Sequence, residues 1–178
     1  EAELPLADRD GFADVFRRFY PPLVRYACRI TGDAAAAGDV LQDVFLKLWE
    51  DRDKLTVEVS VRALLYTMVR NRALNQHRRK RWIANGVAVT DLQVEDPAPG
   101  SEETLSADEL QRHLYGWIGE LPPRRAEAFT LSRYHGLRHS EIAAIMDVSE
   151  RTVDTHILLA LRELRQRLDA LQNEDLSP

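Results

Sequence analysis

The sequence has few of the features that enzymes, secreted proteins and membrane proteins require. Its single cysteine, Cys28, cannot close an internal disulfide, and no Cys/His cluster has zinc-binding spacing. There is no glycine-rich phosphate loop and no nucleophile motif. No apolar run reaches the roughly 18 residues of a membrane-spanning helix, and the first residues lack a hydrophobic signal region. We therefore expect a cytoplasmic protein that is not an enzyme and has no cofactor, metal or membrane insertion.

The charge balance is weakly acidic, which by itself argues against a nucleic-acid-binding protein. The 178 residues carry 24 Lys and Arg against 29 Asp and Glu. Seven of the acids lie between Asp91 and Glu109, where no Lys or Arg occurs. Without those seven, 22 acids of the original 29 face 24 basic residues. The distribution of charge is therefore more informative than its sum.

Apolar residues recur at helical spacing along most of the chain, and no convincing alternating strand is present. Pro21 and Pro22 interrupt the first helical pattern, because proline lacks a backbone N–H. Asp33 is a candidate N-cap for the second helix. The predicted helical segments are 12–31, 34–51, 61–82, 106–121, 123–136, 140–146 and 150–171. A loop is expected over Lys54–Ser60.

Residues 85–105 differ in composition from the segments on either side. They contain glycines and prolines but few large apolar residues, a composition typical of a linker. We therefore predict an all-α fold of two small helical domains, 8–84 and 106–172. An acidic flexible linker, 85–105, joins them.

A short helix, a tight turn and a longer helix within residues 138–165 are typical of a DNA-binding helix-turn-helix. The predicted inward face of the longer helix is Val153, Ile157, Ala160, Leu161, Leu164 and Leu168. The side chains then expected to reach bases or phosphates are Arg151, Thr152, Thr155 and His156. Arg124 and Arg125 are candidate contacts to the DNA backbone. Asp154 lies among them and would repel phosphates unless Arg151 or another base neutralises it. The alternative is a helical hairpin used only for packing.

The third predicted helix ends in a strongly basic stretch, residues 70–82. Its expected inward residues are Leu64, Leu65 and Met68. Asparagine can read base edges, Arg binds phosphate, and aromatic rings stack on unpaired bases. The candidate contacts to single-stranded or melting DNA are Tyr66, Arg70, Asn71, Asn75, Arg78 and Arg79, with Trp82 as a second flat surface. The alternative is a solvated, charged helix end.

The second predicted helix combines acidic and apolar residues beyond its core stripe, which suggests a protein interface. The residues on or near that side are Asp39, Gln42, Asp43, Leu46 and Trp49. In the alternative interpretation, Phe45 and Trp49 simply complete the domain core.

Four motifs, 33–49, 62–75, 121–129 and 140–153, occur in an order that resembles RNA polymerase sigma factors of the sigma-70 family, extracytoplasmic-function (ECF) group. The resemblance implies a region 2-like helical bundle followed by a region 4-like helix-turn-helix. It also implies that core RNA polymerase is bound through the β′ clamp helices and the β flap. The residues that match the core-binding positions are Asp39, Gln42, Asp43, Phe45, Leu46 and Trp49.

The same resemblance implies a mechanism of promoter recognition. The loop 54–60 and a pocket at Tyr66 and Asn71 would capture a flipped base of the −10 element. The helix-turn-helix would bind the −35 duplex, and the acidic linker would follow the RNA path of the polymerase. An anti-sigma factor is an expected partner. Many family members are basic where this chain has Asp154 and its neighbours.

Other interpretations remain open at this point. A helix-turn-helix regulator would bind duplex DNA without polymerase. A decoy of sigma type would bind protein but not DNA, and loss of affinity on mutating Arg78, Arg79 or Arg151 would argue against it.

Overall fold

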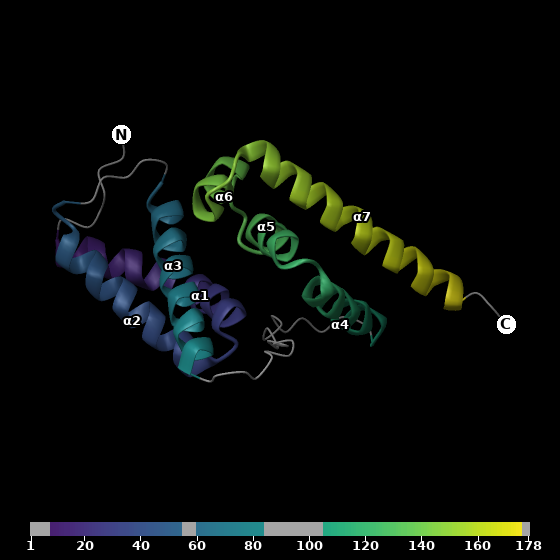
Figure 1. The fold of residues 1–178 in the computed structure, drawn as a ribbon, viewed down its shortest axis with the longest axis horizontal. Helices are drawn as coiled ribbons and strands as arrows, with labels where there is room; N and C mark the ends of the chain where they lie inside the picture. The colour runs from purple at the N-terminus through teal and green to yellow at the C-terminus, as the bar shows by residue number, and fades with distance from the viewer. Residues whose placement is uncertain (1–7, 55–59, 84–104, 176–178) are drawn as a thin grey trace. The chain divides into compact units, whose positions relative to one another are not determined.

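The computed structural model describes residues 8–54, 60–83 and 105–175, with side chains over the same ranges except 77–83, 105–108 and 174–175 (Figure 1). All regular structure in these ranges is α-helical, which confirms the predicted fold class. The helices are α1 Arg9–Thr31, α2 Ala34–Asp51, α3 Val61–Ile83, α4 Leu105–Glu120, α5 Pro123–Arg133, α6 His139–Met146 and α7 Glu150–Asp175.

The chain divides into two compact units, Glu1–Asp96 and Pro97–Pro178. The predicted linker, 85–105, lies outside the described residues apart from Leu105, which begins α4. Most of the predicted loop 54–60 also lies outside them. Each unit is therefore described by itself.

Helix α1 runs without a break through Pro21 and Pro22, so the predicted interruption is wrong. Two prolines remove two backbone donors from the helix, a substantial cost. Residues on both sides of the pair, Val15 and Leu23, are nevertheless buried in one core. Burying a large apolar side chain stabilises the fold by about 1.5–3 kcal/mol. This burial favours one continuous helix over two short ones.

The junction between α1 and α2 is set by two adjacent caps. Gly32 adopts a left-handed conformation with φ 69°, and its N–H donates to the carbonyl of Cys28 at 2.7 Å. Glycine takes this conformation without steric cost. The carboxylate of Asp33 then accepts a hydrogen bond from Ala36 N–H at 2.8 Å, so the predicted N-cap of α2 is confirmed.

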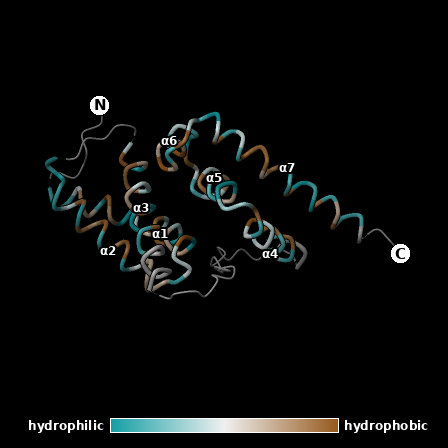
Figure 2. The backbone as a smooth tube through the Cα atoms, viewed as in Figure 1, coloured by the Kyte–Doolittle hydropathy of each residue, from teal (hydrophilic) through white to brown (hydrophobic). Residues whose placement is uncertain are grey.

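The first unit is a three-helix bundle in which α1, α2 and α3 all pack on one another. Figure 2 shows hydrophobic residues recurring along each of these helices. The inward face of α3 is turned slightly from the prediction: Leu65 and Val69 are fully buried, whereas Leu64 and Met68 are half-buried. The buried residues of α3 are Ala63, Leu65, Tyr66, Val69 and Ala73.

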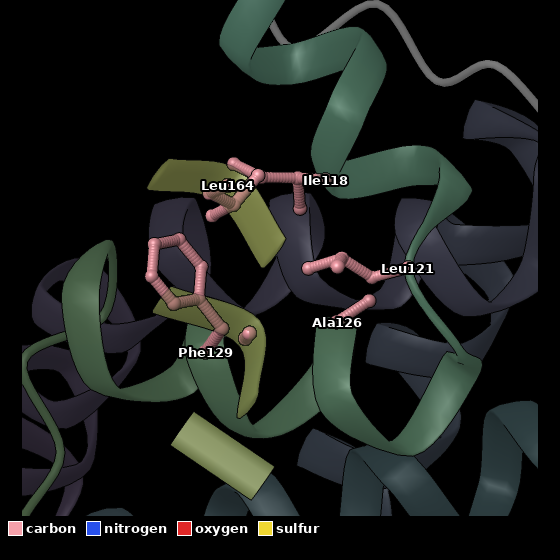
Figure 3. Packing of buried hydrophobic residues seen from close by; sticks show 6 residues of the cluster. Ile118, Leu121, Ala126, Phe129 and Leu164 are labelled. Atoms are coloured by element: carbon pink, nitrogen blue, oxygen red, sulfur yellow. The ribbon is translucent and has the colours of Figure 1, made fainter. Parts of the chain in front are cut away.

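The second unit packs α4, α5 and α6 against the long helix α7. Its core cluster consists of Ile118, Leu121, Ala126, Phe129, Ala160 and Leu164, with Trp117 at its edge (Figure 3). Arg167 pairs with Glu120 of α4 and with Glu163, and the hydrogen bond to Glu120 raises the pKa of Arg167 further above its ordinary value. These contacts fix α4 on α7.

Candidate nucleic-acid and protein interfaces

Helix α2 carries an exposed stripe of four side chains, Asp39, Gln42, Asp43 and Leu46, here called the α2 stripe. Their spacing of three and four residues places them on one side of the helix. Leu46 is 56% exposed, which is high for a leucine in a folded unit. An exposed apolar residue flanked by carboxylates suits a partner surface that is itself basic and partly apolar.

Phe45 does not belong to this exposed surface. It is 4% exposed, and its ring lies 4.8 Å from that of Phe16 and 6.2 Å from that of Phe12, both on α1. Phe45 therefore offers no exposed surface here, and its contact with core polymerase stays a prediction. It completes the core, as the alternative interpretation proposed, and supports the α2 stripe from behind.

Trp49 is neither exposed like the α2 stripe nor fully buried like Phe45. It is half-buried, with its ring 4.9 Å from that of Phe12. The guanidinium of Arg52 lies 4.3 Å from the Trp49 ring and also donates to the Trp49 carbonyl at 2.7 Å. Trp49 thus borders the exposed surface at the end of α2 without standing free of the core.

Asp43 is linked to α3 through Arg72. The Nε of Arg72 donates to Oδ2 of Asp43 at 2.8 Å, and Nη2 contacts the same oxygen. Both side chains are about half exposed. Exposed ion pairs contribute about 0–1 kcal/mol, so Asp43 can exchange this partner for another at little cost.

The candidate DNA contacts of α3 divide into exposed and buried residues. Asn71 and Asn75 are exposed and share one face of the helix, as predicted. Arg70 is half-buried. Tyr66 is 2% exposed, with its ring 5.2 Å from that of Tyr26, so the prediction that it offers a flat surface to an unpaired base is wrong. The side chains of Arg78, Arg79 and Trp82 lie outside the described residues.

The helix-turn-helix has the predicted elements, a short α6, a turn and a long α7. Asp147 ends α6 in a left-handed conformation with φ 54°, and Val148 N–H donates to Ala143 O at 3.1 Å. The hydroxyl of Ser149 then accepts from Thr152 N–H at 3.1 Å and caps α7. These bonds fix the direction in which α7 leaves the turn.

The side of α7 opposite the core carries Arg151, Thr155, Leu158, Arg162 and Arg165, here called the recognition stripe, and all five are exposed. The spacing of four, three, four and three residues keeps them on one side of the helix. Sequence reasoning named the first two and missed the other three, although the same spacing counted onward from Arg151 would have found them.

Other predicted residues of α7 lie off this stripe. Thr152 and His156 are half-buried, and Nδ1 of His156 is buried without a recorded hydrogen-bond partner. His156 therefore lies on the flank between the stripe and the core. Leu161, predicted to face inward, is 39% exposed, because Val153 and Ile157 turn the buried face away from it.

The two arginines at the start of α5 differ in their surroundings. Arg124 is exposed, and its Nη1 donates to the carbonyl of Met146 at 3.4 Å, which places it beside the helix-turn-helix turn. Arg125 pairs with Glu163 at 3.5 Å inside the unit. Of the two, only Arg124 lies at the edge of the helix-turn-helix.

Asp154 has a basic neighbour, but it is not Arg151. Nδ1 of His139, the first residue of α6, lies 2.5 Å from Oδ1 of Asp154. A side chain of the neighbouring helix, and not Arg151, is therefore in contact with the Asp154 carboxylate.

Within the described ranges, no group of three or more His, Cys, Asp or Glu side chains could hold a metal ion. No helix of that part of the chain is long and apolar enough to cross a membrane.

Comparison with known proteins gives the same family for both units. Residues 15–83 match the family model for Sigma-70 region 2, and residues 114–164 match that for Sigma-70, region 4. The chain is 31% identical over 150 residues to the ECF RNA polymerase sigma factor SigL of Mycobacterium tuberculosis, covering 84% of each chain. It is 27% identical over 166 residues to the RNA polymerase sigma factor CarQ of Myxococcus xanthus, covering 93% of this chain and 94% of CarQ.

Two solved structures share the fold. The sigma factor RpoE of Bartonella quintana, in complex with the anti-sigma factor NepR, has a TM-score of 0.69 and 22% identity, covering 89% of this chain and 96% of RpoE. CnrH, in complex with the cytosolic domain of CnrY, has a TM-score of 0.65 and 21% identity, covering 95% of this chain and 94% of CnrH.

Proposed function

Because this chain belongs to the sigma-70 family and is an RNA polymerase sigma factor of the ECF type, we propose that it directs core polymerase to promoters by recognising and melting a −10 element and binding a −35 element. The observation that carries this proposal is the pair of family matches, one on each compact unit and in the order region 2, region 4. A helix-turn-helix regulator that acts without polymerase would not require a region 2 unit.

The α2 stripe is the proposed contact to core polymerase. Its exposed apolar residue, Leu46, lies on the same side of α2 as Asp39 and Asp43. Buried apolar anchors supply most of the affinity at protein interfaces, whereas complementary charge supplies orientation and association rate. The β′ clamp helices are the proposed partner surface for this stripe, and the β flap that for the second unit.

The exposed amides of α3, Asn71 and Asn75, are the proposed −10 contacts. Asparagine can hydrogen-bond to the edge of a base that has left the duplex stack, and such capture offsets an unstacking cost of a few kcal/mol. Tyr66 contributes by fixing α3 on Tyr26 from inside the bundle. Arg78 and Arg79, further along the same helix, would bind the phosphates.

The recognition stripe is the proposed −35 contact. Arg151 on the first turn of α7 can bond guanine bidentately, and Thr155 one turn later can reach bases or phosphates. Leu158 can contact the methyl group of thymine. Arg124 stands beside the turn as a phosphate contact, whereas Arg162 and Arg165 extend the positive charge along α7.

We propose an anti-sigma factor as a further partner, since the sigma factor RpoE was solved in complex with the anti-sigma factor NepR. We also propose that the chain acts by binding and not by catalysis.

Transcription in vitro tests the proposal. Bacterial core polymerase is incubated with and without the protein on a pool of genomic fragments from its host, and the 5′ ends of the transcripts are sequenced. New ends that share two upstream elements would support the sigma function and reveal the promoter. Absence of new ends with polymerase binding intact would favour a decoy. Absence of both would refute the proposal and favour a regulator of duplex DNA.

A further inference from the structure

The contact between His139 and Asp154 joins the two helices of the helix-turn-helix at the border of the recognition stripe. Nδ1 of His139 lies 2.5 Å from Oδ1 of Asp154, and the two side chains are 43% and 61% exposed. Asp154 is one helical turn from both Arg151 and Leu158. A DNA duplex that contacts those two residues would therefore approach the pair closely.

The protonation state of His139 decides what charge this pair presents to DNA. Histidine is the side chain that ordinarily changes its charge between about pH 5 and 8. With a protonated imidazole the pair has no net charge, whereas with a neutral imidazole it carries the full negative charge of Asp154. Repulsion between that charge and the phosphates grows as the interface excludes water, because the local dielectric constant falls.

The surroundings of the pair contain charges of both signs. On α6, the backbone N–H of Arg138 donates to the carboxylate of Glu141 at 2.9 Å. The charged or titratable residues close to the pair in sequence are His135, Arg138, Glu141, Glu150, Arg151 and His156, and α5, which packs on α6, brings Arg124 to the Met146 carbonyl at the other end of α6. Acids and arginines ordinarily keep their charge between pH 6 and 8. A change in binding over this range therefore points to a histidine, and variants identify which one.

Resting on the proposed DNA-binding function, we propose that His139 is a positioning residue whose protonated imidazole holds and neutralises Asp154 when the recognition stripe binds duplex DNA. Where His139 is neutral in the free chain, binding takes up a proton. The protonated form favours the complex, so affinity is highest at the acidic end of the range and falls as pH rises.

The test measures the dissociation constant of the full chain for a labelled duplex of random sequence at pH 6, 7 and 8, at one ionic strength. Wild-type affinity should fall by up to about tenfold per pH unit, the limit for uptake of one proton. His139→Gln should bind at pH 6 as weakly as the wild type at pH 8 and should change little with pH. Asp154→Asn should bind several-fold more tightly than the wild type at pH 8.

The matched control is His113→Gln, the same substitution on α4, where the His113 ring lies 5.7 Å from that of Trp117 and away from the stripe. It should reproduce the wild-type pH profile. Thermal unfolding of His139→Gln is measured alongside, so that a folding defect is distinguished from loss of the protonatable imidazole. Equal pH profiles for the wild type and His139→Gln would overturn the proposal.

Weaker binding by Asp154→Asn at every pH would also overturn it, and would indicate instead that the carboxylate accepts a hydrogen bond from a cytosine amino group. If the free chain binds no duplex at any pH while the holoenzyme still selects start sites, the inference fails and the proposed function stands. If the protein neither selects start sites nor binds polymerase, the proposed function itself fails.

Discussion

The α2 stripe and the recognition stripe each place an exposed leucine among polar side chains, and they differ mainly in charge. Leu46 is 56% exposed and follows Asp39 and Asp43, whereas Leu158 is 58% exposed and stands between Arg151 and Arg162. Each stripe follows three- and four-residue spacing on one side of a helix. The same apolar element is thus built into an acidic surface in one unit and a largely basic surface in the other.

Opposite charge on the two stripes suits them to two different kinds of partner. A basic surface attracts phosphates, and an acidic one repels them and favours a protein. The leucines then add contact area of the same kind in both places. Asp154 is the acidic exception beside the basic stripe, and it is in contact with His139.

The largest expected effect tests whether the two stripes belong to independent units. Phe45→Ala removes a buried ring from behind the α2 stripe, and truncations of this kind cost about 3–5 kcal/mol. The expected result is unfolding of the first unit at much lower denaturant, with loss of polymerase binding, while the second unit still unfolds as in the wild type. Tryptophan fluorescence follows Trp49 and Trp82 in the first unit and Trp117 in the second.

Leu46→Ala is the control for that variant, because it truncates the neighbouring but exposed residue and should leave stability nearly unchanged. If Phe45→Ala lowered the stability of both units equally, the comparison between two separate surfaces would not hold.

The next largest effect is expected from reversing the character of the α2 stripe. Leu46→Arg places a positive charge at its apolar centre, and loss of an interface anchor costs about 2 kcal/mol or more. We expect affinity for core polymerase to fall about 30-fold, measured by competition with a second sigma factor, without a change in the unfolding midpoint. Lys47→Ala is the matched control, because Lys47 adjoins Leu46 in sequence, is exposed, and pairs with Asp51 at 2.9 Å. Unchanged polymerase affinity in Leu46→Arg would show that the α2 stripe is not the polymerase interface.

Much of the fold follows from local pattern alone. The start of α2 was predicted closely because Asp33 caps it, and the start of α3 because a predicted loop precedes Val61. The turn 147–149 was identified from the spacing of apolar residues on both sides of it. Pro21 and Pro22 misled the prediction, because proline is a local signal and the burial that overrides it depends on packing with α2 and α3.

The sites were harder to predict than the helices. Tyr66 was assigned to a surface because its ring suits stacking on DNA bases, and Phe45 because it matches a core-binding position of the family, but neither signal says which side of a helix is buried. Leu158 was missed for the opposite reason, since an exposed leucine resembles a core residue in sequence. The contact between His139 and Asp154 joins residues fifteen positions apart, and only the angle between α6 and α7 brings them together.

A smaller effect separates charge from sequence readout within the recognition stripe. Arg162→Ala should weaken binding to all duplexes alike and reduce the slope of log affinity against log salt by about one unit, as for one lost phosphate contact. Arg151→Ala should instead cost about 1–3 kcal/mol on the selected promoter and relax the preference at one base pair. The salt series is run on both variants with the promoter recovered from start-site mapping. Identical behaviour of the two would contradict the division of the stripe into a reading end and a phosphate-binding end.

The smallest expected effect concerns the two leucines themselves. Leu158→Ala removes apolar surface that we expect to meet a thymine methyl group, and loss of this contact costs on the order of 1 kcal/mol. Affinity for the −35 duplex should fall a few-fold, and the fall should disappear when the contacted thymine is replaced by uracil, which lacks the methyl group. Polymerase binding should not change, whereas Leu46→Ala should show the reverse pattern. If Leu158→Ala lost as much affinity on the uracil duplex as on the thymine duplex, the leucine would not contact the thymine methyl group. The two leucines would then resemble each other only in being exposed.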